Sequence, residues 1–387
     1  MRFSVDAHTI GCHLTGNEVY IRNLLNEFAR LSPSDDFIVY IAKPDAPSQV
    51  PASFRTRSVS ENPYKRLGLD LPLSIRKDRP ALLHVQYTGP VFCSVPLVVS
   101  LHDVSYLEHP QYFTTYRAKQ LRFTVNRTVR TAAAVLTPSE FSRRSILRHY
   151  ALDPGKVVAV PNGVSSQFRP IDRQVAAGVI EKKFGLRGPF VLTVGDLQPR
   201  KNHMGLLKAF DEMLQAHPQL PHDLVFVGKE TWYSKELHRA VERSSVRGRV
   251  HFMGFVEDAD LVHFYRACDL FCFPSFYEGF GLPILEAMAC GRAVACSNTT
   301  AMPEVANAAG ILFDPHSTAE MVRAMSDVLL DQELRMRLER LGLHRANLFS
   351  WEKAAARTLD VYTRVAGGKK AGGGKKRIKT VVQSRAL

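Results

Sequence analysis

The segment from 274 to 291 holds side chains whose types and spacing suit chemistry on a phosphorylated sugar. It reads P-S-F-Y-E-G-F-G-L-P-I-L-E-A-M-A-C-G, so Glu278 and Glu286 have seven residues between them. The glycines after Glu278 let the backbone approach a ligand, and Pro283 suits the first turn of a helix. A glycine turn leading into a helix N-terminus binds anions, because unpaired N–H groups and the helix dipole face it. The segment therefore predicts a site for a nucleotide diphosphate.

A pair of cations could complete that site. Arg200 and Lys201 follow the apolar run 190–194, which reads as a buried strand ending at Gly195. When a nucleotide-sugar reacts, a diphosphate leaves, and fixed positive charge must meet the negative charge that it gains. Without the segment around Glu278, a solvated turn before a helix would be the preferred interpretation of this pair.

Further segments occur in an order that is similar to a known family. They are M-R-F-S-V-D at the start, L-H-D-V-S-Y-L-E-H-P from Leu101, L-T-P-S-E-F-S-R from Leu136, V-P-N-G-V from Val160 and V-G-D-L-Q-P-R-K-N from Val194. Together with 274–291 they resemble family four of the retaining glycosyltransferases, over most of the chain up to about Trp351. The resemblance implies the GT-B fold, an α/β arrangement of two Rossmann-like domains facing across a cleft.

The resemblance also implies roles for individual residues. Lys201, with Arg200, would contact the diphosphate, and Glu278 would lie beside the transferred sugar. His102 would face that sugar from the first domain. The implied donor-binding set is Gly195, Val256, Phe280, Gly281, Leu282 and Glu286, with the Glu286 carboxylate accepting hydrogen bonds from the ribose hydroxyls. The implied acceptor-side set is Thr15, Gly16 and Asp103, with Asp103 as an orienting partner of His102.

The sequence departs from the family pattern at two places. Many relatives have an arginine directly after the glycine where this chain has Asp196, and two adjacent glycines where it has Thr15-Gly16. Asp258-Ala259-Asp260 looks like the D-x-D metal motif of another glycosyltransferase fold, but it begins a helical pattern, where carboxylates favour the N-terminus. We expect no metal ion and no other cofactor.

Alternating strand and helix patterns must position these residues. Short apolar runs alternate with helical stretches in two sets, which favours parallel sheets with crossover helices. We predict a first domain over 1–170, a joining segment over 168–188 and a second domain over 189–350. The family resemblance implies that a last helix over 351–365 returns to the first domain, and the composition of 366–387 predicts a basic disordered tail.

Composition limits the class of protein. The chain has 387 residues and no apolar stretch that approaches the length of a membrane span. It enters a strand pattern directly, without a leader pattern, and its six cysteines are scattered without metal-like spacing. These features predict a cytoplasmic protein with reduced thiols.

The net charge of +14 is unevenly distributed. Residues 1–170 carry 21 basic and 13 acidic side chains, 171–365 carry 23 and 24, and the tail 366–387 carries seven basic ones. The stretch 116–130 has the pattern of a basic amphipathic helix, which can lie on anionic lipid or simply be a solvated surface helix. We expect contact with an anionic membrane, such as the inner face of the cytoplasmic membrane, rather than with nucleic acid.

The sequence favours a retaining glycosyltransferase that moves a hexose to a saccharide or lipid-linked acceptor. The segments around 199–202 and 276–291 look closest to bacterial mannosyltransferases of surface polysaccharide biosynthesis, which implies GDP-mannose as donor. Two alternatives stay open. One is an enzyme of the same fold, such as a nucleotide-sugar epimerase or a phosphorylase-like enzyme. The other is a non-catalytic basic module that binds membrane or nucleic acid.

Overall fold

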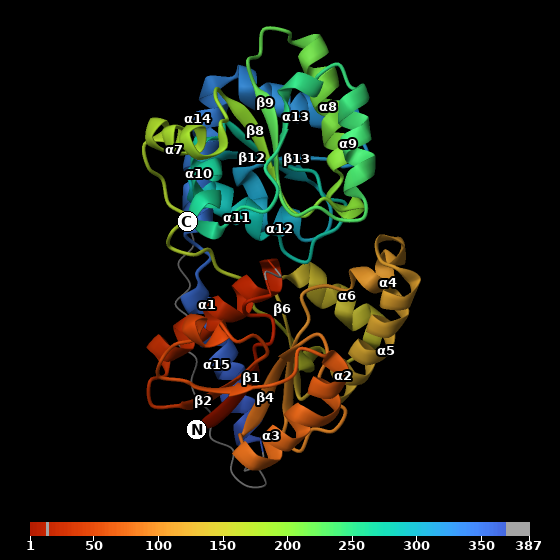
Figure 1. Ribbon diagram of the computed structural model, residues 1–387, viewed down its shortest axis with the longest axis vertical. Coiled ribbons are helices and arrows are strands. Elements are labelled where there is room, and N and C mark those ends of the chain that lie inside the picture. Colours follow the sequence, from red (N-terminus) through yellow and green to blue (C-terminus); the bar gives the residue numbers. More distant parts are fainter. Residues whose placement is uncertain (13–14, 369–387) are drawn as a thin grey trace.

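Two parallel sheets form the centres of two stacked α/β lobes (Figure 1). The computed structural model describes residues 1–12 and 15–368. Within them the first sheet has the order β3 (Arg55–Ser58), β2 (Asp36–Ile41), β1 (Arg2–Asp6), β4 (Leu82–Gln86), β5 (Leu97–Ser100), β6 (Ala134–Thr137), β7 (Val157–Ala159). The second has the order β10 (Val250–Phe252), β9 (Asp223–Val227), β8 (Phe190–Val194), β11 (Leu270–Phe273), β12 (Ala293–Ser297), β13 (Ile311–Phe313). The predicted fold class is confirmed.

Helices cover both faces of each sheet, which is why the central strands are nearly continuous apolar runs. Those of the first lobe are α1 (Thr15–Leu31), α2 (Pro63–Lys65), α3 (Leu71–Asp78), α4 (Ser105–Glu108), α5 (Thr115–Thr131) and α6 (Glu140–Tyr150). Those of the second are α7 (Arg173–Phe184), α8 (His203–Ala216), α9 (Ser234–Arg243), α10 (Asp258–Ala267), α11 (Leu282–Ala289), α12 (Met302–Ala306), α13 (Thr318–Leu330) and α14 (Gln332–Ala346). Among the described helices, none is long and apolar enough to cross a membrane.

One strand was not predicted from the sequence. Every apolar run of the two predicted sets becomes a strand, but β3 reads R-T-R-S and its side chains are largely exposed. It pairs only with β2, at the edge of the first sheet. A charged edge strand discourages further pairing and has no apolar period to reveal it.

The last described helix of the chain belongs to the first lobe. The helix α15 (Trp351–Gly367) lies against α1 among the N-terminal elements (Figure 1). Its buried face places Trp351, Ala355 and Tyr362 in the core of the first lobe. The hydroxyl of Tyr362 also hydrogen-bonds Nδ1 of His84 on β4. The predicted tail extends beyond residue 368, outside the described residues.

The chain crosses between the lobes twice, and the two crossing segments touch. Val164 and Ser350 form an isolated parallel bridge. A side chain at Gly163 would put its Cβ 2.0 Å from the backbone nitrogen of Trp351, so only glycine fits there. The predicted joining segment 168–188 is not a simple linker, because it contains α7, which packs on α10 in the core of the second lobe. The second domain therefore begins before residue 189.

Candidate active site

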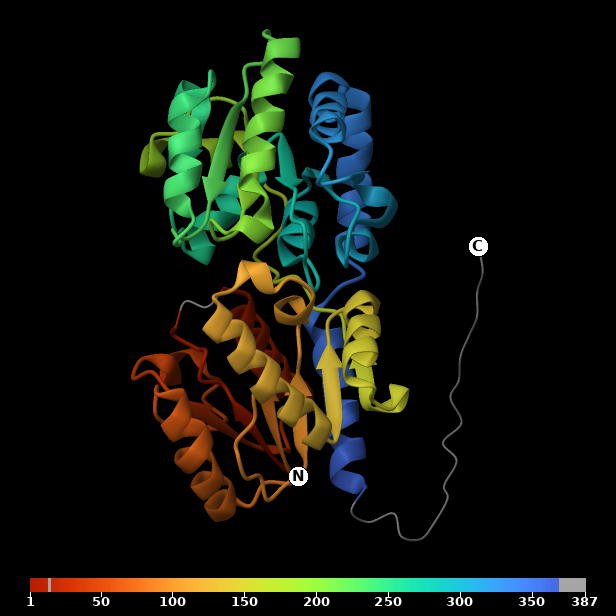
Figure 2. The ribbon, with the colours of Figure 1, turned by 90° about the vertical axis from the view of Figure 1, so that its right-hand side faces the viewer.

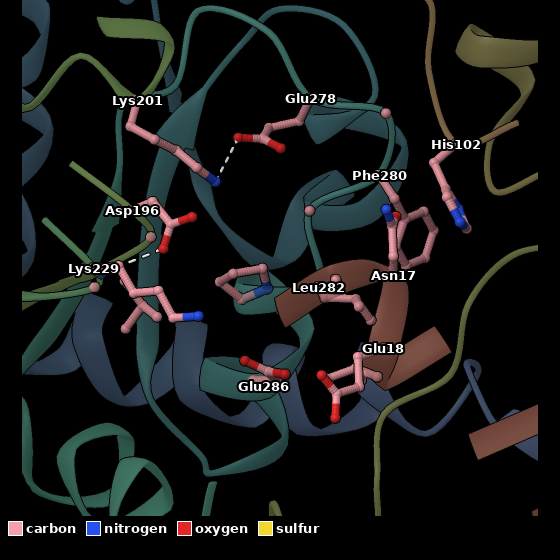
Figure 3. Close-up of a pocket in the computed structure, with 18 of the residues that line it drawn as sticks. Asn17, Glu18, His102, Asp196, Lys201, Lys229, Glu278, Phe280, Leu282 and Glu286 are labelled. Carbon is pink, nitrogen blue, oxygen red and sulfur yellow. Dashed lines mark hydrogen bonds and ion pairs between the residues drawn. The ribbon is translucent and has the colours of Figure 1, made fainter. Parts of the chain in front are cut away.

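A cavity of about 510 Å³ opens between the two lobes, at the carboxyl ends of both sheets. This is where ligands bind in parallel α/β sheets. The first lobe contributes the start of α1 and the loops after β4 and β5. The second contributes the loops after β8, β9, β10 and β11, together with the start of α11. Residues far apart in the sequence thus share one pocket (Figure 3).

The predicted cations and the predicted carboxylate meet in this cavity. Lys201 Nζ donates to Glu278 Oε1 at 2.8 Å, and Arg200 Nη1 lies 2.7 Å from the same oxygen. Burial alone would raise the pKa of Glu278, but the two cations lower it to about 2. Burial lowers the pKa of Lys201, while Glu278 raises the pKa of Arg200 despite burial. Two cations share one carboxylate, so the cluster keeps an excess positive charge suited to an anion.

Local sequence explains how Lys201 reaches Glu278. Pro199 opens a single 3-10 turn, η5 (Pro199–Lys201), which ends at Asn202 in the left-handed region with φ 55°. The Asn202 side chain then caps α8 by accepting from the Gly205 N–H. Gly195 has φ 150°, and a Cβ there would lie 2.8 Å from Lys201 Cε. The glycine predicted to bind the donor therefore also leaves space for the lysine side chain.

The loop that carries Glu278 is held by the other lobe. A Cβ at Gly279 would lie 2.2 Å from the carbonyl oxygen of His102. The glycine was expected to let a ligand approach the backbone, but at this position it is the backbone of the first lobe that comes close. The Gly279 carbonyl accepts from the hydroxyls of Ser139 and Ser142, at 2.7 and 3.1 Å. Ser139 is also the N-cap of α6, where its hydroxyl accepts from the Ser142 N–H. The loop thus connects the two lobes directly beside the charged cluster.

The turn into α11 keeps the anion-binding features that the sequence suggests. Gly281 is the N-cap residue at φ 110°, and no side chain caps the helix. Phe280, Gly281 and Leu282 all line the cavity. The first N–H groups of α11 and the positive end of its dipole therefore face the pocket that holds Lys201.

Glu286 lies one turn into α11 and faces the cavity (Figure 3). The Tyr265 hydroxyl donates to its Oε2 at 2.7 Å and fixes its orientation. Burial raises the pKa of Glu286 to about 7, and the nearby Asp258 adds to the effect. A carboxylate so placed can accept hydrogen bonds from hydroxyl groups of a ligand.

His102 enters the cavity from the first lobe (Figure 3). Its Nε2 lies 2.9 Å from Oε1 of Gln86, the last residue of β4, and the ring of Tyr20 packs edge-on at 4.7 Å. Burial lowers the pKa of His102 to about 4, so the imidazole is neutral near pH 7. Because Oε1 can only accept, Nε2 carries the proton and Nδ1 keeps a lone pair.

The predicted pairing of Asp103 with His102 is wrong. The Asp103 carboxylate instead accepts from the backbone N–H and the hydroxyl of Ser105, at 2.9 and 2.6 Å, at the start of α4. A short polar side chain next to a helix start finds the nearby N–H groups more readily than the adjacent ring. Asp103 still lines the cavity. The partner of His102 is Gln86, which the sequence analysis did not predict. The only signal for it in the sequence was a polar residue at the end of an apolar strand.

Two of the remaining predicted residues, Val256 and Gly16, also line the cavity. Val256 is buried in the wall after β10, and Gly16 lines the rim in the first turn of α1, where a Cβ would meet open space. Thr15 begins α1, but its side chain lies outside what the structure describes. The two acids of the D-x-D pattern are paired with cations: Asp258 with Arg22 across the cleft at 2.6 Å, and Asp260 with Lys183.

Several lining residues were not predicted. Asp196 Oδ1 accepts from the Lys229 N–H at 3.3 Å, and Lys229 Nζ lies over the Phe255 ring. Asn162, within V-P-N-G-V, is buried and its Oδ1 has no partner among the described residues. Glu18 accepts from the Gly11 N–H at the opposite rim. A polar residue just after a predicted strand was the available signal for Asp196 and Lys229.

Two protein-family models match the chain, one in each lobe. The model "Glycosyltransferase Family 4" matches residues 14–168, and "Glycosyl transferases group 1" matches residues 180–344. The O-antigen chain mannosyltransferase B of Escherichia coli is 34% identical over 265 residues, which cover 68% of this chain and 69% of that protein. The serotype-specific mannosyltransferase WbdA of Escherichia coli is 29% identical over 274 residues, which cover 70% of this chain but 32% of WbdA.

Solved structures share the fold. Sucrose-phosphate synthase from Thermosynechococcus elongatus superposes with a TM-score of 0.76 at 18% identity, covering 95% of this chain and 100% of that one. HepE from Anabaena in complex with UDP-glucose superposes with a TM-score of 0.76 at 20% identity, covering 93% and 100%. The two tandem family matches and the 34% identical relative, on a GT-B scaffold, show that the chain belongs to glycosyltransferase family 4 and is a hexosyltransferase.

Proposed function

We propose that the chain transfers mannose from GDP-mannose to a hydroxyl of a saccharide or lipid-linked acceptor, with retention of configuration. The observation that carries the proposal is the Arg200–Lys201–Glu278 cluster beside the uncapped start of α11, in one cavity between two lobes. Two cations and a helix N-terminus suit a diphosphate. A carboxylate and a neutral imidazole suit the hydroxyl groups of a sugar.

In the proposed reaction the bond between sugar C1 and the β-phosphate oxygen breaks, and a bond from C1 to the acceptor oxygen forms on the same face. The acceptor proton passes to the leaving phosphate, so the products are GDP and the glycosylated acceptor. Arg200 and Lys201 stabilise the growing phosphate charge. Glu278 stabilises the positive charge on the ring and holds a sugar hydroxyl.

The other residues bind and orient the substrates. Glu286, held by Tyr265, accepts from the ribose hydroxyls, and His102 presents Nδ1 to a hydroxyl of the sugar. Asp103, Gly16 and Thr15 lie on the acceptor side. Because Arg200 and Lys201 already supply two positive charges, the proposal requires no metal ion.

Separate observations support the donor and the location. Mannose is supported by the names of the E. coli relatives, which are mannosyltransferases. The solved neighbour with UDP-glucose shares only the fold, so it does not decide the base or the sugar. We propose a cytoplasmic location at the inner face of the membrane, which suits a lipid-linked acceptor.

A donor screen tests the function. Purified protein is incubated with GDP-, UDP- and dTDP-sugars, with and without a lipid-linked acceptor library, and products are followed by mass spectrometry. We expect acceptor-dependent release of GDP from GDP-mannose. Turnover of a UDP-sugar alone would defeat the mannose assignment. Phosphate-dependent turnover or epimerisation without an acceptor would favour the epimerase or phosphorylase alternative instead.

A further inference from the structure

Four exposed aromatic side chains gather on the outer face of the first lobe. Phe123 is 73% exposed, Phe92 72%, Tyr116 68% and Tyr64 66%, which is unusual for aromatic residues of a globular protein. Tyr116 and Phe123 belong to α5, Phe92 to the loop between β4 and β5, and Tyr64 to α2. Together with Lys119, Arg122 and Arg130 we call these residues the α5 surface.

Contacts hold the parts of this surface together. The hydroxyls of Tyr64 and Tyr116 are 2.8 Å apart, which joins α2 to α5. The Arg127 guanidinium donates to the carbonyls of Gly89, Pro90 and Val91, which fixes the loop of Phe92 against α5. Figure 2 shows α5 crossing the side of the first lobe that faces the viewer. The aromatic side chains therefore lie on one connected face.

The periodicity of α5 separates this face from the core. Tyr116, Phe123 and Arg130 recur every seven residues, which keeps them on one side of a helix. Val125 and Val129, on the opposite side, are fully buried in the core of the first lobe. The exposed aromatic side chains therefore do not belong to the core of the first lobe.

The charge around the aromatic residues has one sign. Between Glu108 and Glu140 the chain has five Arg or Lys residues and no Asp or Glu. Among the described residues, none of the five forms an ion pair with a carboxylate; Arg117 and Arg130 donate only to amide side chains. Unpaired cations beside exposed aromatic rings match the headgroup region of an anionic bilayer, where rings insert and cations meet phosphates.

We propose that the α5 surface docks on an anionic phospholipid bilayer, with Phe92 and Phe123 in the interface and Lys119, Arg122 and Arg130 on lipid phosphates. Tyr87, which follows β4 and lines the cavity, is five residues before Phe92. Docking there brings the cavity near the membrane surface, where a lipid-linked acceptor would lie. The proposal deepens the proposed function but rests on it only for the identity of that acceptor.

Vesicle binding tests the surface with the full chain. Sedimentation with phosphatidylcholine vesicles is compared with sedimentation on vesicles containing phosphatidylglycerol. We expect binding only with the anionic lipid, and a loss of at least about tenfold for Lys119→Glu/Arg130→Glu, since each basic residue near the surface contributes about 1 kcal/mol. The Phe92→Ser/Phe123→Ser variant should weaken binding comparably.

Matched controls use the second lobe. Arg337 and Arg340 are exposed on α14, and Trp232 is 70% exposed, so Arg337→Glu/Arg340→Glu and Trp232→Ser make equivalent changes elsewhere. They should bind vesicles like the wild type. The proposal would be overturned if the wild type bound neutral vesicles equally well, or if the control variants lost as much binding as the surface variants. It would also be overturned if the wild type were a dimer that the Phe92→Ser/Phe123→Ser substitutions convert to a monomer. The surface variants should still glycosylate a soluble acceptor. If neither the wild type nor any variant glycosylated it, that result would contradict the proposed function and not the docking surface.

Discussion

The two halves of the cleft are held in different ways. In the second lobe, Lys201, Arg200 and Glu278 form a charged cluster that turns and glycines position, so backbone geometry determines it. In the first lobe, the neutral His102 is positioned by a side chain, because Gln86 holds it and itself donates to Thr9. The net charge of the two lobes shows the opposite distribution. The first lobe has the excess of basic residues and carries exposed cations on its outer face, although the charged cluster of the cleft belongs to the second lobe.

This contrast shows that the sign of a domain's charge says little about its site. The cations of the second lobe are buried against one carboxylate, where electrostatic interactions are strong. The exposed cations of the first lobe are screened by solvent and salt, so they suit a broad anionic surface. If the charged half of the cleft drives the chemistry and the neutral half only adjusts it, substitutions in the charged half should have the larger effects.

The largest effect is expected for Lys201→Met. This change removes the buried cation that we propose stabilises the leaving phosphate, and we expect kcat at saturating donor to fall by about 10²–10³, as for loss of one preorganised donor. Lys208→Met is the matched control, since Lys208 is 67% exposed on α8. Near-normal turnover by Lys201→Met would mean that the charged half does not drive the reaction.

Glu278→Gln tests the same cluster through stability. The substitution leaves Arg200 and Lys201 buried without a carboxylate, which should cost about 3 kcal/mol in the free energy of unfolding. GDP or pyrophosphate should then raise Tm more in the variant than in the wild type, because the anion replaces the missing charge. Glu212→Gln, on an exposed pair of α8, should hardly change Tm. An equal ligand response in variant and wild type would contradict a diphosphate site at these cations.

Gln86→Glu tests the neutral half. A carboxylate beside His102 should raise the imidazole pKa from about 4 toward neutrality, so that a proton is bound as the pH falls. Nδ1 then loses its lone pair, and the pH–rate profile should gain an acid limb that the wild type lacks. Gln86→Met should lower kcat by about tenfold without that limb, a change typical of one lost positioning contact. Identical profiles for all three proteins would show that His102 does not act on the substrate.

The smallest effect concerns Glu286. Its pKa is raised from 4.5 to about 7 by burial, so the fold favours the protonated form. Its contribution to stability is present below about pH 4.5 and is lost as the pH rises through about 7. Glu286→Gln should therefore show a flatter decline of Tm over this range. GDP affinity of the wild type should tighten a few-fold above about pH 7, where the carboxylate can accept both ribose hydroxyls, while a pH-independent Kd in the wild type would argue against that contact.

Much of the fold could be read from the sequence because it depends on neighbouring residues. Apolar runs such as Leu270–Phe273 are buried on both faces, and Gly281 before Pro283 marks a helix start. These local patterns also located Lys201 and Glu278. By contrast, β3 lacked an apolar pattern, α7 was taken for a linker, and Asp103 was paired with the wrong side chain. Each of these depends on what packs against the segment.

By itself the sequence determined every strand except β3, the glycine turn before α11 and the identity of the charged residues, because each is encoded over a few consecutive positions. Only the tertiary structure decided that Lys201 and Arg200 share the carboxylate of Glu278, which lies 77 residues after Lys201 in the sequence. It also decided that Gln86 holds His102 and that Gly279 touches the opposite lobe. The order of the strands and the approach of the two lobes bring these groups together, and no local pattern specifies that distance.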